Sequence, residues 1–339
     1  LFFQTMNAHQ RTEALKAGIE LEVFTAIGEG NTTVAEIAKR CQASEKGIRV
    51  LCDYLTIMEM LTKQGDRYGL TLDSSVFLDK RSPAYLGGAV EFLGDPKLTS
   101  GSKFMTDAVR KGGTALPDDG TLGPENPVWV TFARAMAALM DLPSQLMAKL
   151  VDPQGDRKLK ILDVEMTIYP TADICQWPGH GLFGIAFAKN NPQVEVTALD
   201  WKAVLEVAKE NAQKAGVADR YSTIEGSAFD VEYGSGYDLV LLTNFLHHFD
   251  APTCETLLRK VHAALADGGR AVALEFVPNE DRVTPPDAAG FSMMMLTTTP
   301  SGDAYTFSEL ERMAANAGFS RSTLHPLPPT IEQVVISEK

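Results

Sequence analysis

The first hundred residues show short apolar repeats that are typical of amphipathic helices. Apolar side chains recur with a roughly helical period over residues 12–27, and two glycines then end the run. Thr33 lies three residues ahead of Glu36, which is the pattern of a capping box at a helix start. A second helix is predicted over residues 47–61, and a hairpin around a Gly-Asp turn is predicted over 61–70. Helix, turn, helix and hairpin together predict a winged-helix layout.

A winged helix serves either as a DNA reader or as a packing and dimerisation module. Residues 1–100 hold 11 basic and 13 acidic side chains, and the second helix offers only Lys46 and Arg49 as cations. A DNA reader requires a basic face, because phosphate contacts dominate its affinity. We therefore expect a structural role for this region and no nucleic-acid partner.

From residue 158 onward, apolar strands alternate with longer helical repeats. Strands are predicted at Leu159–Val164, Val194–Leu199, Ser222–Ile224, Leu239–Thr243 and Ala271–Phe276. Helices are predicted at Leu182–Lys189, Ala203–Ala215, Pro252–Leu265 and Phe307–Ala317. This alternation predicts an α/β fold with a Rossmann-like, doubly wound and mostly parallel sheet. Two further strands, 322–327 and 333–336, are expected to add an antiparallel hairpin at its edge.

The same pattern divides the chain into three parts. Residues 1–112 are expected to form the winged-helix-like domain. Residues 113–150 are expected to form a linker and a connecting helix, because a Gly-, Pro- and Asp-rich stretch precedes an apolar stripe. Residues 151–339 then form the sheet domain.

Composition supports an ordinary globular protein of 339 residues with 45% hydrophobic side chains. The net charge of −13 argues against a protein that binds the phosphate backbone of nucleic acids. The cysteines lie at positions 41, 52, 175 and 254 without a CxxC pair, which favours reduced thiols in a cytoplasmic protein and no metal site. No apolar run approaches the ~18 residues of a membrane helix, so no membrane partner is expected.

Candidate chemistry lies where parallel strands end, since ligands of doubly wound sheets bind there. Gly179, Gly181 and Gly184 fit G-x-G-x-x-G, and Asp200 follows about 20 residues later at the end of the next strand. This spacing suits an adenosine cofactor, because the glycines allow close approach and a carboxylate binds ribose hydroxyls. The alternatives are a glycine-rich turn with Asp200 as a helix cap, or a nicotinamide dehydrogenase.

A second candidate group joins two strand ends. His247 and His248 follow the strand 239–243, and Glu275 closes the next strand. If these strands are neighbours, the carboxylate orients one imidazole and stabilises its charged form. The pattern therefore predicts a general base.

At this point the chain resembles the class I S-adenosylmethionine-dependent small-molecule O-methyltransferases of the plant caffeate and bacterial polyketide type. The resemblance covers most of the chain, and its motifs are Ile161-Leu162-Asp163-Val164, Gly179-His180-Gly181, Leu199-Asp200, Gly226-Ser227-Ala228-Phe229, Leu246-His247-His248-Phe249, Ala264-Leu265-Ala266-Asp267-Gly268-Gly269 and Leu274-Glu275. It implies S-adenosylmethionine as cofactor, a hydroxyl on a small aromatic molecule as methyl acceptor, and a homodimer built through the N-terminal domain.

The resemblance also implies residue roles. His247 matches the base and Glu275 the acid that orients it. The cofactor residues implied are Asp163, Gly179, Gly181, Asp200, Trp201, Ser227, Ala228, Phe229, Asn244 and Phe249. The substrate residues implied are Met136, Phe291, Met294 and Met295, whose soft and flat side chains suit an aromatic acceptor.

The chain departs from the family pattern in three places. A second supporting Glu falls on Ala304, and an Asp on the adenine side falls on Ser227. The segment Glu165–Pro178 separates the first strand from the glycine turn, where a direct connection is expected. An alternative function therefore stays open, namely a methyltransferase fold that transfers no methyl group because this segment interrupts the cofactor loop.

Overall fold

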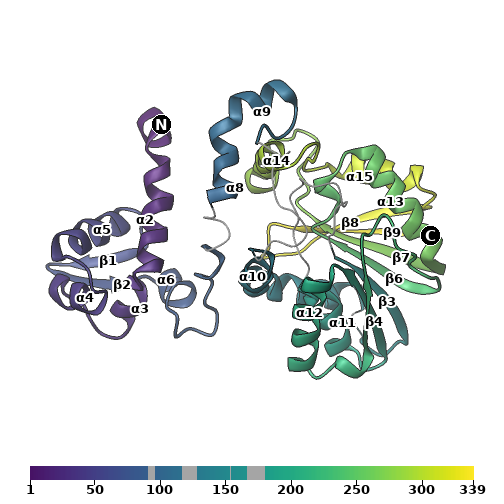
Figure 1. Ribbon diagram of the computed structural model, residues 1–339, viewed down its shortest axis with the longest axis horizontal. Helices are drawn as coiled ribbons and strands as arrows, with labels where there is room; N and C mark the ends of the chain where they lie inside the picture. The colour runs from purple at the N-terminus through teal and green to yellow at the C-terminus, as the bar shows by residue number, and fades with distance from the viewer. Residues whose placement is uncertain (91–95, 117–127, 153, 166–179) are drawn as a thin grey trace. The chain divides into compact units, whose positions relative to one another are not determined.

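The computed structural model describes residues 1–90, 96–116, 128–152, 154–165 and 180–339, with 96–98 and 128–138 described by their backbone alone (Figure 1). The chain divides into two compact units, Leu1–Pro96 and Lys97–Lys339. Each unit is described by itself below.

The first unit consists of helices around a small hairpin. Its elements are α1 (Phe2–Met6), α2 (Ala8–Glu20), α3 (Val23–Gly28), α4 (Val34–Arg40), α5 (Glu45–Ile57), β1 (Leu61–Gln64), β2 (Arg67–Leu70) and α6 (Leu72–Phe77). The Thr33 side chain caps α4, and Glu36 returns the bond to the Thr33 backbone, so the predicted capping box is confirmed. Phe24, Ile37, Cys52 and Leu55 are among the fully buried core residues. Helix, turn, helix and hairpin are thus present in the predicted order.

Two helix boundaries in this unit differ from the sequence predictions. The single helix predicted over residues 12–27 is wrong, because Glu22 adopts a left-handed φ of 57° and separates α2 from α3. The helix predicted to reach residue 61 ends at Ile57, since Glu59 has a φ of 63° and Leu61 already begins β1. Left-handed residues end helices, and for glutamate such a conformation comes from tertiary context rather than local preference.

The second unit contains the sheet and its covering helices. Its elements are α8 (Pro96–Gly101), η1 (Ser102–Phe104), α9 (Met105–Lys111), α10 (Val128–Val151), β3 (Leu159–Val164), α11 (Leu182–Asn190), β4 (Val194–Asp200), α12 (Lys202–Lys214), η3 (Ala218–Arg220), β5 (Tyr221–Glu225), β6 (Tyr237–Thr243), η4 (Leu246–His248), α13 (Ala251–Ala264), β7 (Leu265–Glu275), α14 (Pro286–Thr298), α15 (Phe307–Asn316), β8 (Arg321–Pro326) and β9 (Gln333–Glu338).

The seven strands lie in the order β5-β4-β3-β6-β7-β9-β8. The first five are parallel, and β9 runs antiparallel to both β7 and β8, which confirms the predicted sheet with its terminal hairpin. Helices α11 and α12 cover one face, whereas α13 and α15 cover the other (Figure 1). Because both faces are covered, the central strands are continuous apolar runs, as the sequence pattern indicated.

Helix α9 belongs to the second unit by its contacts. The predicted domain boundaries at residues 112 and 150 stay predictions, and much of the expected linker lies outside the described residues.

Cys41, Cys52 and Cys254 are free thiols, while Cys175 lies outside the described residues. Within the described ranges, no helix is both long and apolar enough to span a membrane. The same ranges contain no cluster of three or more His, Cys, Asp or Glu side chains arranged for a metal ion.

Candidate active site

The sheet topology brings the predicted site residues to one edge. Strands β3, β4, β6 and β7 are parallel, so their carboxyl ends, which carry Val164, Asp200, Thr243 and Glu275, lie at the same side of the sheet. The chain runs outward from β3 through β4 to β5 and then returns to β6 on the other side of β3. Such a switch point opens a crevice in which ligands of doubly wound folds bind.

The glycine turn packs tightly against the protein around it at the start of α11. Gly181 precedes α11 with a left-handed φ of 72°, and a Cβ there would lie 2.5 Å from the Tyr221 hydroxyl. A Cβ on Gly184 would lie 2.6 Å from the Val196 side chain, so this glycine lets α11 pack closely on the sheet. Both positions therefore require glycine. Gly179, the first glycine of the predicted motif, lies outside the described residues.

Two buried acids bond to the start of α11. Asp163 accepts a 2.7 Å hydrogen bond from the Gly184 backbone N–H, and Glu165 accepts one of 2.7 Å from Gly181. The second oxygens of the two carboxyl groups, Asp163 Oδ1 and Glu165 Oε2, have no hydrogen-bond partner among the described residues. Burial raises the pKa of Asp163 to about 7, and burial beside Asp163 and Asp200 raises the pKa of Glu165. Hydrogen-bond donors from a ligand would favour both charged forms.

The acid after the second strand lies where the motif predicts it. Asp200 is fully buried at the end of β4, and its Oδ1 accepts a 2.6 Å bond from the Trp201 backbone N–H. The indole N–H of Trp201 is buried and has no partner among the described residues.

The turn after β5 approaches the end of β6 through aromatic contacts. Ser227 and Ala228 are buried, and the Ser227 hydroxyl accepts a bond from the Phe229 N–H. The Phe229 ring lies 5.1 Å from the Phe249 ring in an edge-on arrangement. The turn and Phe249 thus form one apolar wall, which matches the predicted position of a flat adenine ring.

His247 and Glu275 meet above the edge, as predicted from the two strand ends. Nδ1 of His247 lies 2.5 Å from Oε2 of Glu275, and both side chains are almost fully buried. Glu275 Oε1 also accepts the backbone N–H groups of Phe245 and Leu246, at 3.1 and 2.7 Å. His248 stacks beside His247 with 4.2 Å between ring centroids. Of these two histidines, His247 is the one bonded to the carboxylate.

The protonation of this pair follows from burial. Burial lowers the pKa of His247 to about 3, so the imidazole is neutral near pH 7. Burial raises the pKa of Glu275, but the hydrogen bonds from the backbone of residues 245–247 lower it and so favour the carboxylate. A neutral imidazole that donates a hydrogen bond from Nδ1–H to Glu275 carries its lone pair on Nε2. The geometry therefore provides an oriented proton acceptor.

Aromatic side chains surround this acceptor. Phe291 on α14 lies 4.8 Å from the His247 ring and stacks on Phe276 at 4.0 Å. Met295 and Ala304 are buried and pack in the same cluster, whereas Met294 is 37% exposed. Ala304 therefore contributes packing at the position where the family pattern has a second glutamate. The side chain of Met136, in α10, lies outside the described residues.

Sequence reasoning missed Glu165, Tyr221 and Phe276 as neighbours of the site. The Tyr221 hydroxyl is buried among Asp163, Glu165 and Asp200, which raise its pKa together with burial. The sequence could have indicated Phe276, since it directly follows Glu275 at a strand end. It could not have indicated Tyr221, because this residue stands at the amino end of β5 and reaches the acids only through the fold.

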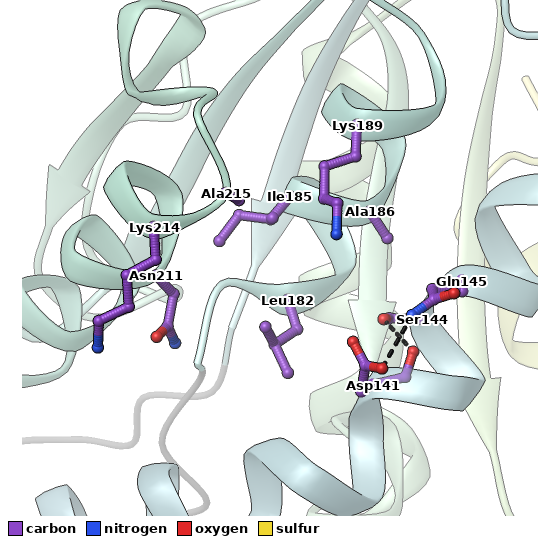
Figure 2. Close-up of a pocket in the computed structure, with 10 residues that line it drawn as sticks. All are labelled: Asp141, Ser144, Gln145, Leu182, Ile185, Ala186, Lys189, Asn211, Lys214 and Ala215. Carbon is purple, nitrogen blue, oxygen red and sulfur yellow. Dashed lines mark hydrogen bonds between the residues drawn. The ribbon is translucent and has the colours of Figure 1, made fainter. Parts of the chain in front are cut away.

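Figure 2 shows a separate surface pocket of about 260 Å³. It lies between α10, α11 and α12 and is lined by Asp141, Ser144, Gln145, Leu182, Ile185, Ala186, Lys189, Asn211, Lys214 and Ala215. None of the predicted site residues lines it. In the view, Lys189 and Lys214 lie on different helices, and Gln145 and Ser144 bond to Asp141 (Figure 2). The pocket is thus distinct from the site around His247.

The described residues fit an adenosine cofactor that carries an ammonium group. The second oxygens of Asp163 and Glu165 can accept hydrogen bonds from such an ammonium group. An oriented histidine lies one strand away from these two acids. S-adenosylmethionine, an adenosine compound with an ammonium group and a methyl donor, fits this arrangement.

Comparisons with known proteins define the family. Residues 134–320, more than half of the chain, match the O-methyltransferase domain, and residues 3–80 match the O-methyltransferase dimerisation domain. The chain therefore belongs to the O-methyltransferase family. The dimerisation domain supports assembly as a homodimer.

Three similar proteins illustrate this relationship. The structure of a putative O-methyltransferase from Nostoc punctiforme is 55% identical, with a TM-score of 0.93 over 100% of this chain and 98% of that one. The 3-hydroxy-5-methyl-1-naphthoate 3-O-methyltransferase of Streptomyces sahachiroi is 28% identical over 91% of this chain and 86% of its own length. The tetracenomycin polyketide synthesis 8-O-methyl transferase of Streptomyces glaucescens is 25% identical over 97% and 94%. These comparisons favour methyl transfer over the non-methylating alternative.

Proposed function

We propose that this protein transfers a methyl group to a hydroxyl of a small aromatic molecule, with His247 as general base. The observation that carries this proposal is the His247–Glu275 pair, which lies beside the aromatic cluster of Phe276 and Phe291. The names of two relatives, which act on a naphthoate and in tetracenomycin synthesis, support an aromatic acceptor. When bound, S-adenosylmethionine supplies an electrophilic methyl group on a sulfonium.

His247 removes the hydroxyl proton of the acceptor in this proposal. Glu275 accepts a hydrogen bond from the Nδ1–H group and so fixes the tautomer, and Nε2 accepts the proton that leaves the hydroxyl. The carboxylate then stabilises the imidazolium that forms, because the two groups lie in direct contact. Both backbone N–H groups that bond to Glu275 Oε1 keep the acid in place.

The other residues hold the two reactants in this proposal. Asp200 binds the ribose hydroxyls, Asp163 and Gly181 lie beside the methionine part, and Trp201, Ser227, Ala228, Phe229 and Phe249 line the remaining cofactor surface. Asn244, which the resemblance also assigns to the cofactor, instead lies beside Glu332. Phe291, Met294 and Met295 contact the acceptor, and the prediction for Met136 falls on a side chain outside the described residues. Positioning is the main contribution of the protein, since holding two reactants in line removes most of the entropic barrier.

The test uses trideuteromethyl-labelled S-adenosylmethionine with a panel of phenols and naphthols. We expect a product in which one hydroxyl hydrogen is replaced by the labelled methyl group, detected by mass spectrometry and assigned to oxygen by NMR. Labelling on carbon or nitrogen alone, or cofactor binding with no product from any phenol, would contradict the proposal.

We further propose that the homodimer forms through residues 1–112. The α1 side chains Phe2, Phe3 and Met6 are 70%, 78% and 60% exposed, and Ile57 of α5 is 74% exposed. Exposed apolar side chains of this number favour a protein interface. Light scattering of the whole chain should give twice the monomer mass. Replacing Phe2 and Phe3 by serine should shift the protein towards monomer, and an unchanged dimer would contradict this interface.

A further inference from the structure

Glu332 is a buried acid that the reaction described above does not use. Its residue is 3% exposed and directly precedes β9. The next residue, Gln333, lies opposite Glu275 in the sheet register, and its side chain donates a 2.8 Å hydrogen bond to the Val277 carbonyl. Glu332 thus lies beside the carboxyl end of β7, the strand that carries Glu275.

Asn244 reaches the same place from the other side of β7. It follows β6, and its backbone N–H donates to the Leu274 carbonyl at 2.8 Å. Its φ of 53° is left-handed, a conformation that is uncommon for residues other than glycine and often marks functional sites. The Asn244 amide donates to Met140 Sδ of α10 at 3.6 Å and also hydrogen-bonds the Glu332 carboxyl group.

Both side chains keep one oxygen without a partner. Glu332 Oε1 and Asn244 Oδ1 are buried and make no hydrogen bond with any described residue. Buried polar atoms in native proteins are nearly always bonded, so two unsatisfied oxygens in one place need an explanation. Burial also raises the pKa of Glu332 to about 7, although the bond from Asn244 acts against this shift. Because both free oxygens are acceptors, the complementary ligand group is a hydrogen-bond donor.

The strand order assigns this donor to the methyl acceptor rather than to the cofactor. The adenosine residues lie on β3, β4 and the turn after β5, which are on one side of β6. Glu332 precedes β9, on the far side of β7, and Glu275 at the end of β7 holds the base. A group near Glu332 therefore lies beyond the base as seen from the cofactor.

We propose that Glu332 and Asn244 form a specificity site, which binds a second hydroxyl or amino group on the aromatic methyl acceptor. This inference rests on the proposed function. The inference limits the substrates to aromatic molecules with at least two hydrogen-bond-donating groups. One of these groups is methylated, and Glu332 binds the other.

The test compares the binding of dihydroxynaphthalenes with that of 1-naphthol and 2-naphthol. Calorimetry on the wild-type enzyme saturated with S-adenosylhomocysteine should show at least one dihydroxynaphthalene isomer binding about tenfold more tightly than either naphthol. Glu332→Leu should remove this preference and leave naphthol binding nearly unchanged. Glu332→Gln keeps a carbonyl acceptor and should retain part of the preference. Glu338→Leu, at the exposed far end of the same strand, is the matched control.

The outcomes separate this inference from the proposed function, because the measurement is binding rather than turnover. Equal binding of all naphthalene probes to the wild type, or no binding, would overturn the specificity site. An unchanged preference in Glu332→Leu would also overturn it. If Glu332→Leu weakens S-adenosylhomocysteine instead, the pair belongs to the cofactor site and the inference is wrong. If Glu332→Leu does not fold, the test uses Glu332→Gln and the same ratio of dihydroxynaphthalene affinity to naphthol affinity. An unchanged ratio in Glu332→Gln would then overturn the inference.

Discussion

The carboxyl edge of the sheet has two parts, the ends of β6 and β7 and the ends of β3 and β4, and their buried acids differ in their hydrogen bonds. At β7, Glu275 receives three donors from the chain itself, two backbone N–H groups and His247 Nδ1. At β3, Asp163 and Glu165 each receive one backbone N–H and keep a second oxygen without a partner among the described residues. The first end is complete within the chain, whereas the second is suited to donors from a ligand.

This difference indicates a division of labour along the sheet edge. The β6–β7 end orients a proton acceptor in advance, which is how preorganised groups lower a barrier. In the proposed function, the β3–β4 end binds the cofactor and takes no part in proton transfer. Substitutions at the two ends should therefore change different measurable quantities.

The largest effect is expected for His247→Ala. Removing the base should lower kcat about 10²–10⁴-fold, because general-base catalysis contributes on this order. Steady-state rates with a labelled methyl donor measure the loss. Retained turnover would show that another group takes the proton.

Glu275→Gln should have the next largest effect. The amide oxygen can still accept the backbone N–H groups, but its NH₂ would then face Nδ1 of His247 and favour the wrong tautomer. We expect a loss of about 10²-fold in kcat with little change in the affinity for S-adenosylhomocysteine. A rate equal to that of the wild type would contradict the orienting role.

The cofactor end should show acid sensitivity through His180. Burial lowers the pKa of this residue to about 4, so the unfolded chain binds more protons than the folded chain between about pH 4 and pH 6.5. The free energy of unfolding should therefore fall as the pH drops through this window. Urea unfolding at pH 7 and pH 5 should show a smaller loss for His180→Gln than for the wild type, by about 2 kcal/mol. An equal loss in both proteins would contradict this account.

Gly181→Ala should have a smaller effect, again confined to the cofactor end. The left-handed φ of 72° costs alanine about 1 kcal/mol, and its Cβ would lie 2.5 Å from the Tyr221 hydroxyl. We expect about tenfold weaker S-adenosylhomocysteine binding and a lower melting temperature. Gly290→Ala, where a Cβ meets nothing within 4 Å, is the stability control. Equal behaviour of the two variants would argue against a tight turn at Gly181.

Most of the sheet could be predicted from the sequence because its strands are buried on both faces. The run Leu159–Val164 was predicted with the bounds that β3 has, since a continuous apolar segment between polar ends leaves little choice. The break at Glu22 could not be predicted, because a left-handed glutamate reflects packing of the surrounding helices.

The site could be predicted only as far as its residues occupy strand ends. His247 and Glu275 follow β6 and end β7, and strand pairing then brings them together. Glu165 and Glu332 precede or follow strands without any motif, and their importance arises from burial and from contacts across the sheet. Such contacts depend on topology, which local patterns do not encode.

The division of labour is tested most directly by titrating S-adenosylhomocysteine calorimetrically into the wild type, His247→Ala and Asp200→Ala. The account predicts that His247→Ala binds within about twofold of the wild type and that Asp200→Ala binds at least about tenfold more weakly, since it loses hydrogen bonds to the ribose. Weak binding by His247→Ala together with unchanged binding by Asp200→Ala would contradict it.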